Sequence, residues 1–436
     1  MEHPAVRKAA FRLIPFLFFL YVIAYIDRVN VGFAKLEMKE VSWFSDAIFA
    51  SGAGIFFFGY FLFEVPSNLI LRKVGARLWI TRIMITWGLI SAMMALSNSV
   101  LTFYFFRFML GVAEAGFFPG VLLYLTFWFT RQERARVVAL FMTANAVALT
   151  FGGPLSGWIL DKAKDLPALA PWQWLFVLEG IPAALIGFVV LLYLPNGPKD
   201  AKWLSKEERQ VIEERLRVEE EEFGTPTSVE DSHDSAVLKT LLRDPRVWMW
   251  CSVYFLLVFG MYGITMWLPQ LLKSMSGGNN TLVGQLTAIP YFTAGIAMVA
   301  NAWHSDKTGE RRWHIAVPAI VGSVGLALSG QVFMPLWGSL VCLSVAAAGM
   351  WSTLGPFWAV PPQFLRGTYI AAGLAFINSV GNLAGFAGPK LFGKVKADGN
   401  DFLPSLLLLA SFVMAGGLLA AFVTRKLEKN PTSSDV

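Results

Sequence analysis

The chain has 436 residues, of which 56% are hydrophobic and only 15% are charged, and its mean hydropathy is +0.55. A soluble domain carries about 25% charged residues, so the composition excludes a soluble globular protein and favours one that is covered by lipid. The formal net charge of +6 comes from short basic clusters between apolar runs. Nucleic-acid binders gather such charge on one face of a folded module, so this pattern argues against nucleic acid as a partner.

Long apolar runs divide the chain into two similar halves. A membrane-spanning helix needs about 20 mostly apolar residues. Six such runs come before a polar central segment and six follow it, at 13–34, 47–71, 78–97, 101–127, 135–160, 173–194, 247–271, 281–303, 313–333, 337–360, 366–388 and 402–424. The sequence therefore predicts an all-α membrane protein of twelve transmembrane helices, with one six-helix bundle over 12–195 and a second over 246–426.

The segment 196–245 between the halves is polar and highly charged. We expect it to be a central cytoplasmic loop with an amphipathic surface helix over 203–218, followed by a mobile linker. A tether between the two bundles explains such a segment, and a regulatory or partner-binding site is the alternative.

The basic residues predict the orientation of the chain. If the N-terminus lies inside, the cytoplasmic segments hold about twice as many lysines and arginines as the outer loops. The positive-inside rule then places both termini in the cytoplasm. We expect a multi-pass protein of the inner (plasma) membrane.

The two halves also share a short motif. Arg72, Gly75 and Arg77 follow the second apolar run, and Lys307, Gly309 and Arg311 follow the eighth. Two similar halves joined by a long loop predict structural repeats that pack around a binding site near the membrane midplane.

Five charged residues stand out within apolar runs of the first half: Asp27, Arg28, Glu64, Arg107 and Glu114. A charge at the bilayer centre costs about 2.5–3.5 kcal/mol on insertion scales, so such residues usually face a cavity or a partner. At 1.5 Å per residue, Arg28 lies about 7 Å outward of the middle of its helix, Arg107 about 10 Å outward of its own, and Glu114 near the middle. Two cations and two carboxylates are therefore expected to converge in the outer part of the first bundle.

This arrangement suits the binding of an organic anion together with protons. The guanidinium fork of Arg28, and that of Arg107, matches a substrate carboxylate. Asp27 and Glu114 are the candidates for taking up and releasing protons, because burial and a nearby arginine shift a carboxyl group in opposite directions. The alternative is a structural ion-pair network. Glu64, just before Pro66, is a candidate gate or structural residue.

The second half is expected to supply the rest of the pocket. Asn378 and Asn382 lie four residues apart on one face of the eleventh run. Buried amides in lipid need polar partners, which a substrate or a neighbouring helix can provide. Trp351 and Trp358 flank Pro356, which can break or bend the tenth run. They are candidates for an aromatic wall against the substrate, or for ordinary packing.

The second of the two shared turns resembles a loop motif of the major facilitator superfamily, Gly-x-x-x-Asp-Arg-x-Gly-Arg. The matching positions are Asp306, Lys307, Gly309 and Arg311, with Ala302 in place of the first glycine. The first copy has Arg72 where that motif has aspartate. The resemblance implies the twelve-helix fold of that superfamily and a cytoplasmic gate, which we assign to Arg72, Arg77, Asp306 and Arg311 together with Glu64.

Three segments, 25–34, 59–68 and 107–120, resemble the first, second and fourth helices of the anion:cation symporter family. Members of that family typically import sugar acids, tartrate, phthalate or hydroxyphenylacetate with protons. The resemblance implies that Asp27 and Glu114 are proton-coupling carboxylates. It also implies that Tyr25, Arg28 and Tyr60 contact the substrate.

The sequence thus predicts a secondary active transporter that imports a small organic carboxylate by proton symport, with an organic-anion exchanger or exporter of the same fold as the alternative. A membrane enzyme or sensor is disfavoured, since the sequence has no nucleotide-binding loop, metal-ligand cluster or catalytic nucleophile with its base. We expect no cofactor and no metal, a small organic anion, protons and lipid as partners, and a monomer.

Overall fold

The computed structural model describes residues 3–223, 235–331, 333–365, 368–396 and 401–429. These residues form helices and connecting turns, without a β strand. The helices of the first half are α1 (Pro4–Met38), α2 (Asp46–Val74), α3 (Ala76–Met93), the 3-10 turn η1 (Met94–Leu96), α4 (Val100–Glu114), α5 (Phe117–Thr126), α6 (Arg131–Met142), α7 (Ala144–Ala163) and α8 (Pro171–Tyr193). The central segment contains η2 (Pro198–Asp200), α9 (Lys206–Phe223) and α11 (Ser235–Arg243). The second half contains α12 (Pro245–Ser276), α13 (Asn280–Thr308), α14 (Arg312–Ser329), α15 (Leu336–Ser352), α16 (Leu354–Trp358), α17 (Pro361–Phe364), α18 (Thr368–Asn382), α19 (Ala384–Val395) and α20 (Leu403–Lys429).

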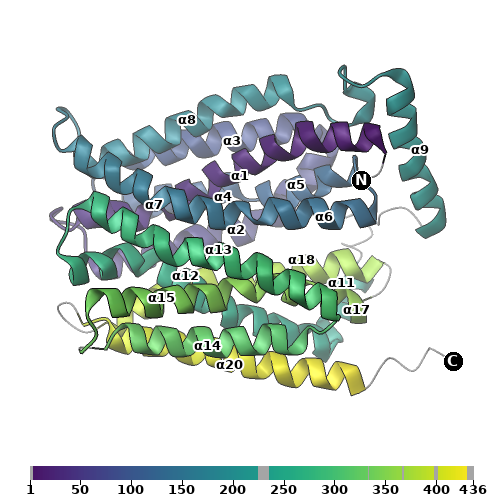
Figure 1. Ribbon diagram of the computed structural model, residues 1–436. Helices are drawn as coiled ribbons and strands as arrows, with labels where there is room; N and C mark the ends of the chain where they lie inside the picture. The colour runs from purple at the N-terminus through teal and green to yellow at the C-terminus, as the bar shows by residue number, and fades with distance from the viewer. Residues whose placement is uncertain (1–2, 224–234, 332, 366–367, 397–400, 430–436) are drawn as a thin grey trace.

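The helices of the two halves form two neighbouring groups (Figure 1). Helices α1 to α8 make up one group and α12 to α20 the other, with their axes running roughly along one common direction. Helix α9 lies beyond one end of the first group, beside the start of α1. We call this end of the molecule the α9 end and the opposite one the far end.

Ten helical stretches of the described residues are long and apolar enough to cross a membrane. The predicted runs at 135–160 and 366–388 are not among them. Each is divided between two shorter helices, α6 and α7 in the first case and α18 and α19 in the second. The all-α membrane fold is thus confirmed, and the number twelve remains a prediction.

Two other predicted runs are also interrupted, each for a local reason. The fourth run breaks between α4 and α5, where Gly116 has a φ of 86°. A Cβ atom there would lie 2.3 Å from Oγ of Ser67 on α2, so the break depends on glycine. The tenth run ends as α15 at Ser352 and restarts as α16, one turn that contains Pro356. The predicted interruption of this run is therefore confirmed.

The shared turn motif has a glycine with a positive φ in both halves, although ψ differs, at 149° for Gly75 and 0° for Gly309. Gly75 follows α2 with a φ of 93°, and Gly309 follows α13 with a φ of 71°. Helices often end at a glycine in this region, because a side chain there is strained. The repeated glycine therefore marks the same helix end twice.

The predicted surface helix of the central segment is present as α9, five residues longer at its C-terminal end than expected. Ion pairs attach it to the first half, from Glu208 to Lys8 on α1 at 2.7 Å and from Arg215 to Glu133 on α6 at 2.8 Å. Most of the predicted linker, 224–234, lies outside the described residues.

At the far end, a buried charge cluster joins the two halves. The carboxylate of Asp46, at the start of α2, lies 2.9 Å from Nζ of Lys35 on α1 and 2.6 Å from Nζ of Lys396, next to α19. Lys35 is fully buried, and its Nζ lies 3.2 Å from the centre of the Trp267 ring on α12. One carboxylate therefore balances two ammonium groups where the halves meet.

We expect Asp46→Asn to weaken this contact. The substitution leaves two buried ammonium groups facing a neutral amide. Removing one partner of a fully buried ion pair costs about 3–5 kcal/mol, and the side chain of Asp46 is 35% exposed, so we expect a cost below that range. Thermal unfolding of the purified protein should show a clearly lower midpoint. Asp165→Asn, at an exposed carboxylate of the same end, is the matched control. Equal midpoints for the two variants would contradict the role of Asp46.

Candidate functional site

The centre of the site is an ion pair between α1 and α4. Nε of Arg28 donates to Oε1 of Glu114 at 2.9 Å, and its Nη2 bonds to the same oxygen. The rings of Tyr25, Phe56 and Tyr60 surround the guanidinium, with centroids 5.4, 5.7 and 5.4 Å from its carbon. Such faces favour a cation, so the guanidinium is held in place from several sides.

A second guanidinium lies close to this pair. Arg107 is fully buried on α4, and its Nε donates to the carbonyl of Gly52 at 3.1 Å. Its Nη1 and Nη2 are buried without a hydrogen-bond partner among the described residues, and so is Oε2 of Glu114. Phe56 lies between the two arginines, with its ring 5.0 Å from Arg107 and 5.7 Å from Arg28. Two cations thus face one carboxylate, so the group carries one uncompensated positive charge.

Asp27 does not join this group. Its Oδ1 accepts from Asn30 at 3.0 Å and from Ser91 on α3 at 2.8 Å. Neighbouring residues of a helix point about 100° apart, so Asp27 and its neighbour Arg28 face different helices. The structure therefore brings together Arg28, Arg107 and Glu114, and the predicted meeting of all four charges is wrong for Asp27.

Glu64 connects the two halves nearer the α9 end of α2. Its Oε1 accepts from Asn378 at 3.1 Å and its Oε2 from Ser379, also at 3.1 Å, both on α18. The amide of Asn378 is thus bound to protein in this conformation. Asn382, one turn further along α18, is half-buried.

Tyrosine rings of the second half pack against the two predicted tryptophans. Trp358 packs edge-on against Tyr254 at 4.9 Å, and Trp351 against Tyr291 at 5.4 Å. Tyr262 reaches across to the first half, where its ring lies 4.4 Å from that of Phe57 and its hydroxyl faces Arg28.

Three further buried residues were not predicted from the sequence: Glu179, Lys35 and Tyr262. Glu179 is a buried carboxylate alone in the apolar run 173–194, the same pattern that singled out Glu64. Lys35 follows the predicted run 13–34, which would place it in an outer loop, but α1 continues past it and buries it. Tyr262 gave a weaker indication, because its run 247–271 contains other hydroxyl groups as well.

The predicted gate residues at the shared turns bond within their own halves. Arg77 donates from its backbone to Asn196 at 3.1 Å and from Nε to the carbonyl of Leu191 at 2.6 Å. Arg311 pairs with Asp306 at 2.6 Å. The side chain of Arg72 lies outside the described part of the structure. Of the predicted gate residues, Glu64 is thus the one with a described contact between the halves.

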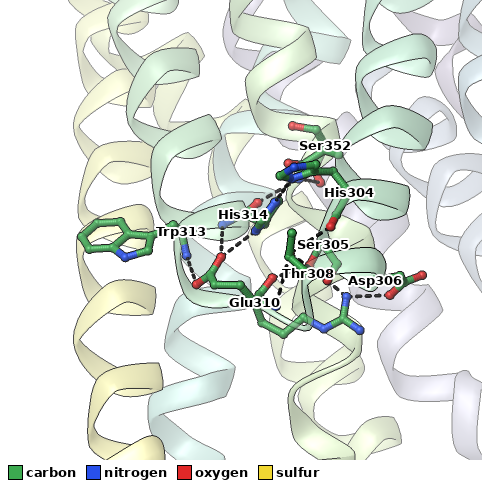
Figure 2. Close-up of polar contacts among 10 residues, drawn as sticks. His304, Ser305, Asp306, Thr308, Glu310, Trp313, His314 and Ser352 are labelled. Atoms are coloured by element: carbon green, nitrogen blue, oxygen red, sulfur yellow. Dashed lines mark hydrogen bonds and ion pairs between the residues drawn. The ribbon is translucent and has the colours of Figure 1, made fainter.

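The turn between α13 and α14 also holds a chain of polar contacts (Figure 2). Nδ1 of His314 lies 2.6 Å from Oε2 of Glu310, and its Nε2 lies 2.6 Å from Nδ1 of His304. A carboxylate only accepts, so His314 donates to Glu310 and accepts from His304. Glu310 also accepts from the backbone N–H of Trp313 at 2.7 Å, at the start of α14. Burial alone would raise the pKa of Glu310, but these donors together hold it below its usual range.

We expect Glu310→Gln to destabilise this turn at neutral pH by about 0.5–2 kcal/mol, the range for loss of a helix cap. A lowered pKa means that the stabilisation is present above the unfolded-state pKa and is lost as the pH falls through the folded-state value. Thermal unfolding at neutral and acidic pH should therefore show a difference from the unsubstituted protein that shrinks in acid. Glu40→Gln, at an exposed carboxylate, is the control. A deficit that persists unchanged in acid would contradict the role of the charge.

Comparison with known proteins places this geometry in context. Residues 17–389 match the family described as Major Facilitator Superfamily. The chain is 44% identical to a protein of Agrobacterium vitis named "Putative tartrate transporter", over 98% of this chain and 93% of that protein. It is 39% identical to a "Quinolone resistance transporter" of Acinetobacter baumannii, over 99% and 98% of the two chains. The crystal structure of a bacterial homologue of the human lysosomal transporter Spinster, in an inward-facing and unoccupied conformation, superposes with a TM-score of 0.79 at 15% identity and covers 100% of both chains.

Proposed function

Because this chain belongs to the Major Facilitator Superfamily of membrane transporters and is not an enzyme, we propose that it imports a small organic carboxylate by proton symport. The observation that carries this proposal is the excess of guanidinium over carboxylate at the centre of the first half. Glu114 pairs with Arg28 alone, and the buried Nη atoms of Arg107 have no acceptor among the described residues. A substrate carboxylate supplies both the missing charge and the missing acceptors.

Proton and anion binding reinforce each other in this arrangement. Nε and Nη2 of Arg28 both donate to Oε1 of Glu114. A proton on Glu114 removes that partner and releases the fork for the substrate. A bound carboxylate in turn screens the arginine and favours the proton, because coupling between two binding sites is reciprocal. The proton therefore raises the affinity for the substrate.

The remaining predicted contacts complete the substrate site. Tyr25 and Tyr60 stack on Arg28, and Trp351, Trp358 and Asn382 contribute from the second half. Asn378 becomes available when its bond to Glu64 opens. The tartrate name of the 44% identical relative favours a hydroxylated acid as the substrate, whose hydroxyl groups need polar partners of this kind.

Transport by alternating access requires the halves to separate at one end at a time. We place both termini and α9 in the cytoplasm, with the chain in the plasma membrane. The far end then faces outward, where Asp46 bridges Lys35 and Lys396 and closes the path between the halves in this conformation. Opening that cluster admits the substrate, and breaking the bonds from Glu64 to Asn378 and Ser379 separates the halves nearer the cytoplasm.

Uptake into proteoliposomes under an imposed pH gradient tests the proposal. The panel is tartrate, several hexonates, phthalate and 4-hydroxyphenylacetate. Accumulation of one of them that depends on the gradient and collapses with a protonophore is the expected result. Uptake by exchange alone, indifferent to the gradient, would overturn proton symport.

The second candidate is an exchanger or exporter with the same fold. The 39% identical relative named for quinolone resistance favours it. Extrusion of a fluoroquinolone against its gradient, without uptake of any acid on the panel, would establish this alternative.

A further inference from the structure

Away from the arginine site, the first half contains a second polar cluster, formed by side chains of α1, α3, α7 and α8. Its members are all buried, with between 0% and 7% of their surface exposed: Asp27, Asn30, Ser91, Ser156 and Glu179. Asn30 and Ser91 both donate to Oδ1 of Asp27, and Ser156 donates to Oε1 of Glu179 at 2.7 Å. The carboxylate of Glu179 faces Asp27 and Asn30.

This cluster has more hydrogen-bond acceptors than bonded donors among the described residues. Three of its oxygens are buried without a partner: Oδ2 of Asp27, Oδ1 of Asn30 and Oε2 of Glu179. All three are acceptors. A buried polar atom left unsatisfied costs about 1–3 kcal/mol, so the accumulation of three in one place calls for an explanation.

No cation among the described residues balances the two carboxylates. Neither Asp27 nor Glu179 has an ion pair in that part of the chain, and the neighbouring Arg28 is turned to Glu114. The charged or titratable groups that face the pair are Glu114 from α4 and the two carboxylates themselves. Helices α3 and α7 present the hydroxyls of Ser91 and Ser156, and α3 also presents the indole N–H of Trp87 to Asp27. Two adjacent buried carboxylates without a cation cannot both ionise at low cost.

We propose that Asp27 and Glu179 form one proton-binding site, in which the two carboxyl groups share a single proton. A proton on either carboxyl supplies the missing donor and removes one of two like charges. Carried on Oε2 of Glu179, it can bond to Oδ1 of Asn30 and satisfy two of the three unpaired atoms at once. Asn30, which already donates to Asp27, then connects the two carboxyl groups.

The role of this site in coupling rests on the proposed symport. Proton binding at the site does not. It assigns Asp27 a partner on α8 that the arginine site does not contain. The helices that hold it all belong to the first half, so the proton is bound apart from the substrate carboxylate.

The test is a proton titration of the purified full-length protein between about pH 6 and pH 8.5, without substrate. We expect Asp27→Asn and Glu179→Gln each to lower proton uptake over this range by about one proton per chain. Both carboxyl groups are required to hold the shared proton, so loss of either one removes the site. The double variant should lose no more proton uptake than either single variant, because each single substitution already removes the one shared proton.

Glu133→Gln is the matched control, because Glu133 is buried and paired with Arg215 at 2.8 Å. Its titration should match that of the unsubstituted protein. A Glu179→Gln curve that also matches, or a double variant that loses two protons, would overturn the shared site.

Ser156→Ala provides a second test that needs no change of charge. Loss of the hydroxyl that bonds Glu179 should move release of the shared proton to higher pH, because the ionised form loses a donor. An unchanged titration would count against Glu179. These measurements do not depend on transport. Absence of carboxylate uptake would therefore refute the proposed function without refuting this site. An unchanged titration would refute this site without refuting the proposed function.

Discussion

We expect Asp27→Asn to abolish gradient-driven accumulation of the carboxylate and to leave exchange across the membrane intact. One proton that moves down a gradient of about one pH unit releases about 1.4 kcal/mol, which supports about tenfold accumulation. The variant should lose this factor, since an amide in place of Asp27 carries no exchangeable charge. The substrate site is built on Arg28 and Arg107, so binding and counterflow should persist.

The fold should tolerate this change. Asn at position 27 keeps an oxygen to accept from Asn30 and Ser91, and its amide supplies a donor where the cluster lacks one. The measurement compares accumulation under a pH gradient with counterflow at equal pH in the same proteoliposomes. Full accumulation by the variant would remove Asp27 from the coupling mechanism, whereas loss of counterflow as well would indicate damage to the substrate site.

Arg28→Lys should weaken the binding of the carboxylate by about tenfold to a hundredfold. The guanidinium offers a planar fork and stacks against three rings, whereas an ammonium is a compact point charge. A hydrogen bond to a charged group contributes about 1.5–3 kcal/mol, and each 1.4 kcal/mol is about a factor of ten in affinity. Loss of one arm of the fork therefore accounts for the expected range.

Arg82→Lys is the matched control for this variant. Arg82 also stacks on an aromatic ring, that of Trp79 at 3.9 Å, but it lies on α3 outside the site. Substrate affinity, measured by isothermal titration with the acid identified in the uptake panel, should drop for the first variant and stay unchanged for the control. Unchanged affinity in Arg28→Lys would contradict the carboxylate clamp.

The fold was predictable because its main determinant is local. Lipid leaves no partner for an unpaired backbone group, so each long apolar run must be helical whatever its neighbours are. Local chemistry also predicted the interruption at Pro356 and the surface helix α9. The sequence did not reveal the break at Gly116, because that break depends on how closely α4 approaches Ser67 on α2.

The site was only partly predictable, because a charge within an apolar run indicates burial but not direction. Asp27 and Arg28 are neighbours in the chain, yet one faces Ser91 on α3 and the other Glu114 on α4. Asn378 lies on a polar helix face as expected, but its partner is Glu64 of the other half. Glu179 is, like Glu64, a single charge within an apolar run, so the sequence alone indicates its burial.

The sequence by itself determined the membrane environment, the two similar halves and the residues that carry charge into the bilayer, because hydrophobicity and helix periodicity act over short distances along the chain. Tertiary packing alone decided which of those charges meet. It joined Arg28 and Arg107 at Phe56 with a single carboxylate, it placed Asp27 against Glu179, and it buried Lys35 at the contact between the halves. The rotation of each helix about its axis sets these pairings, and that rotation is fixed by contacts between residues far apart in the chain.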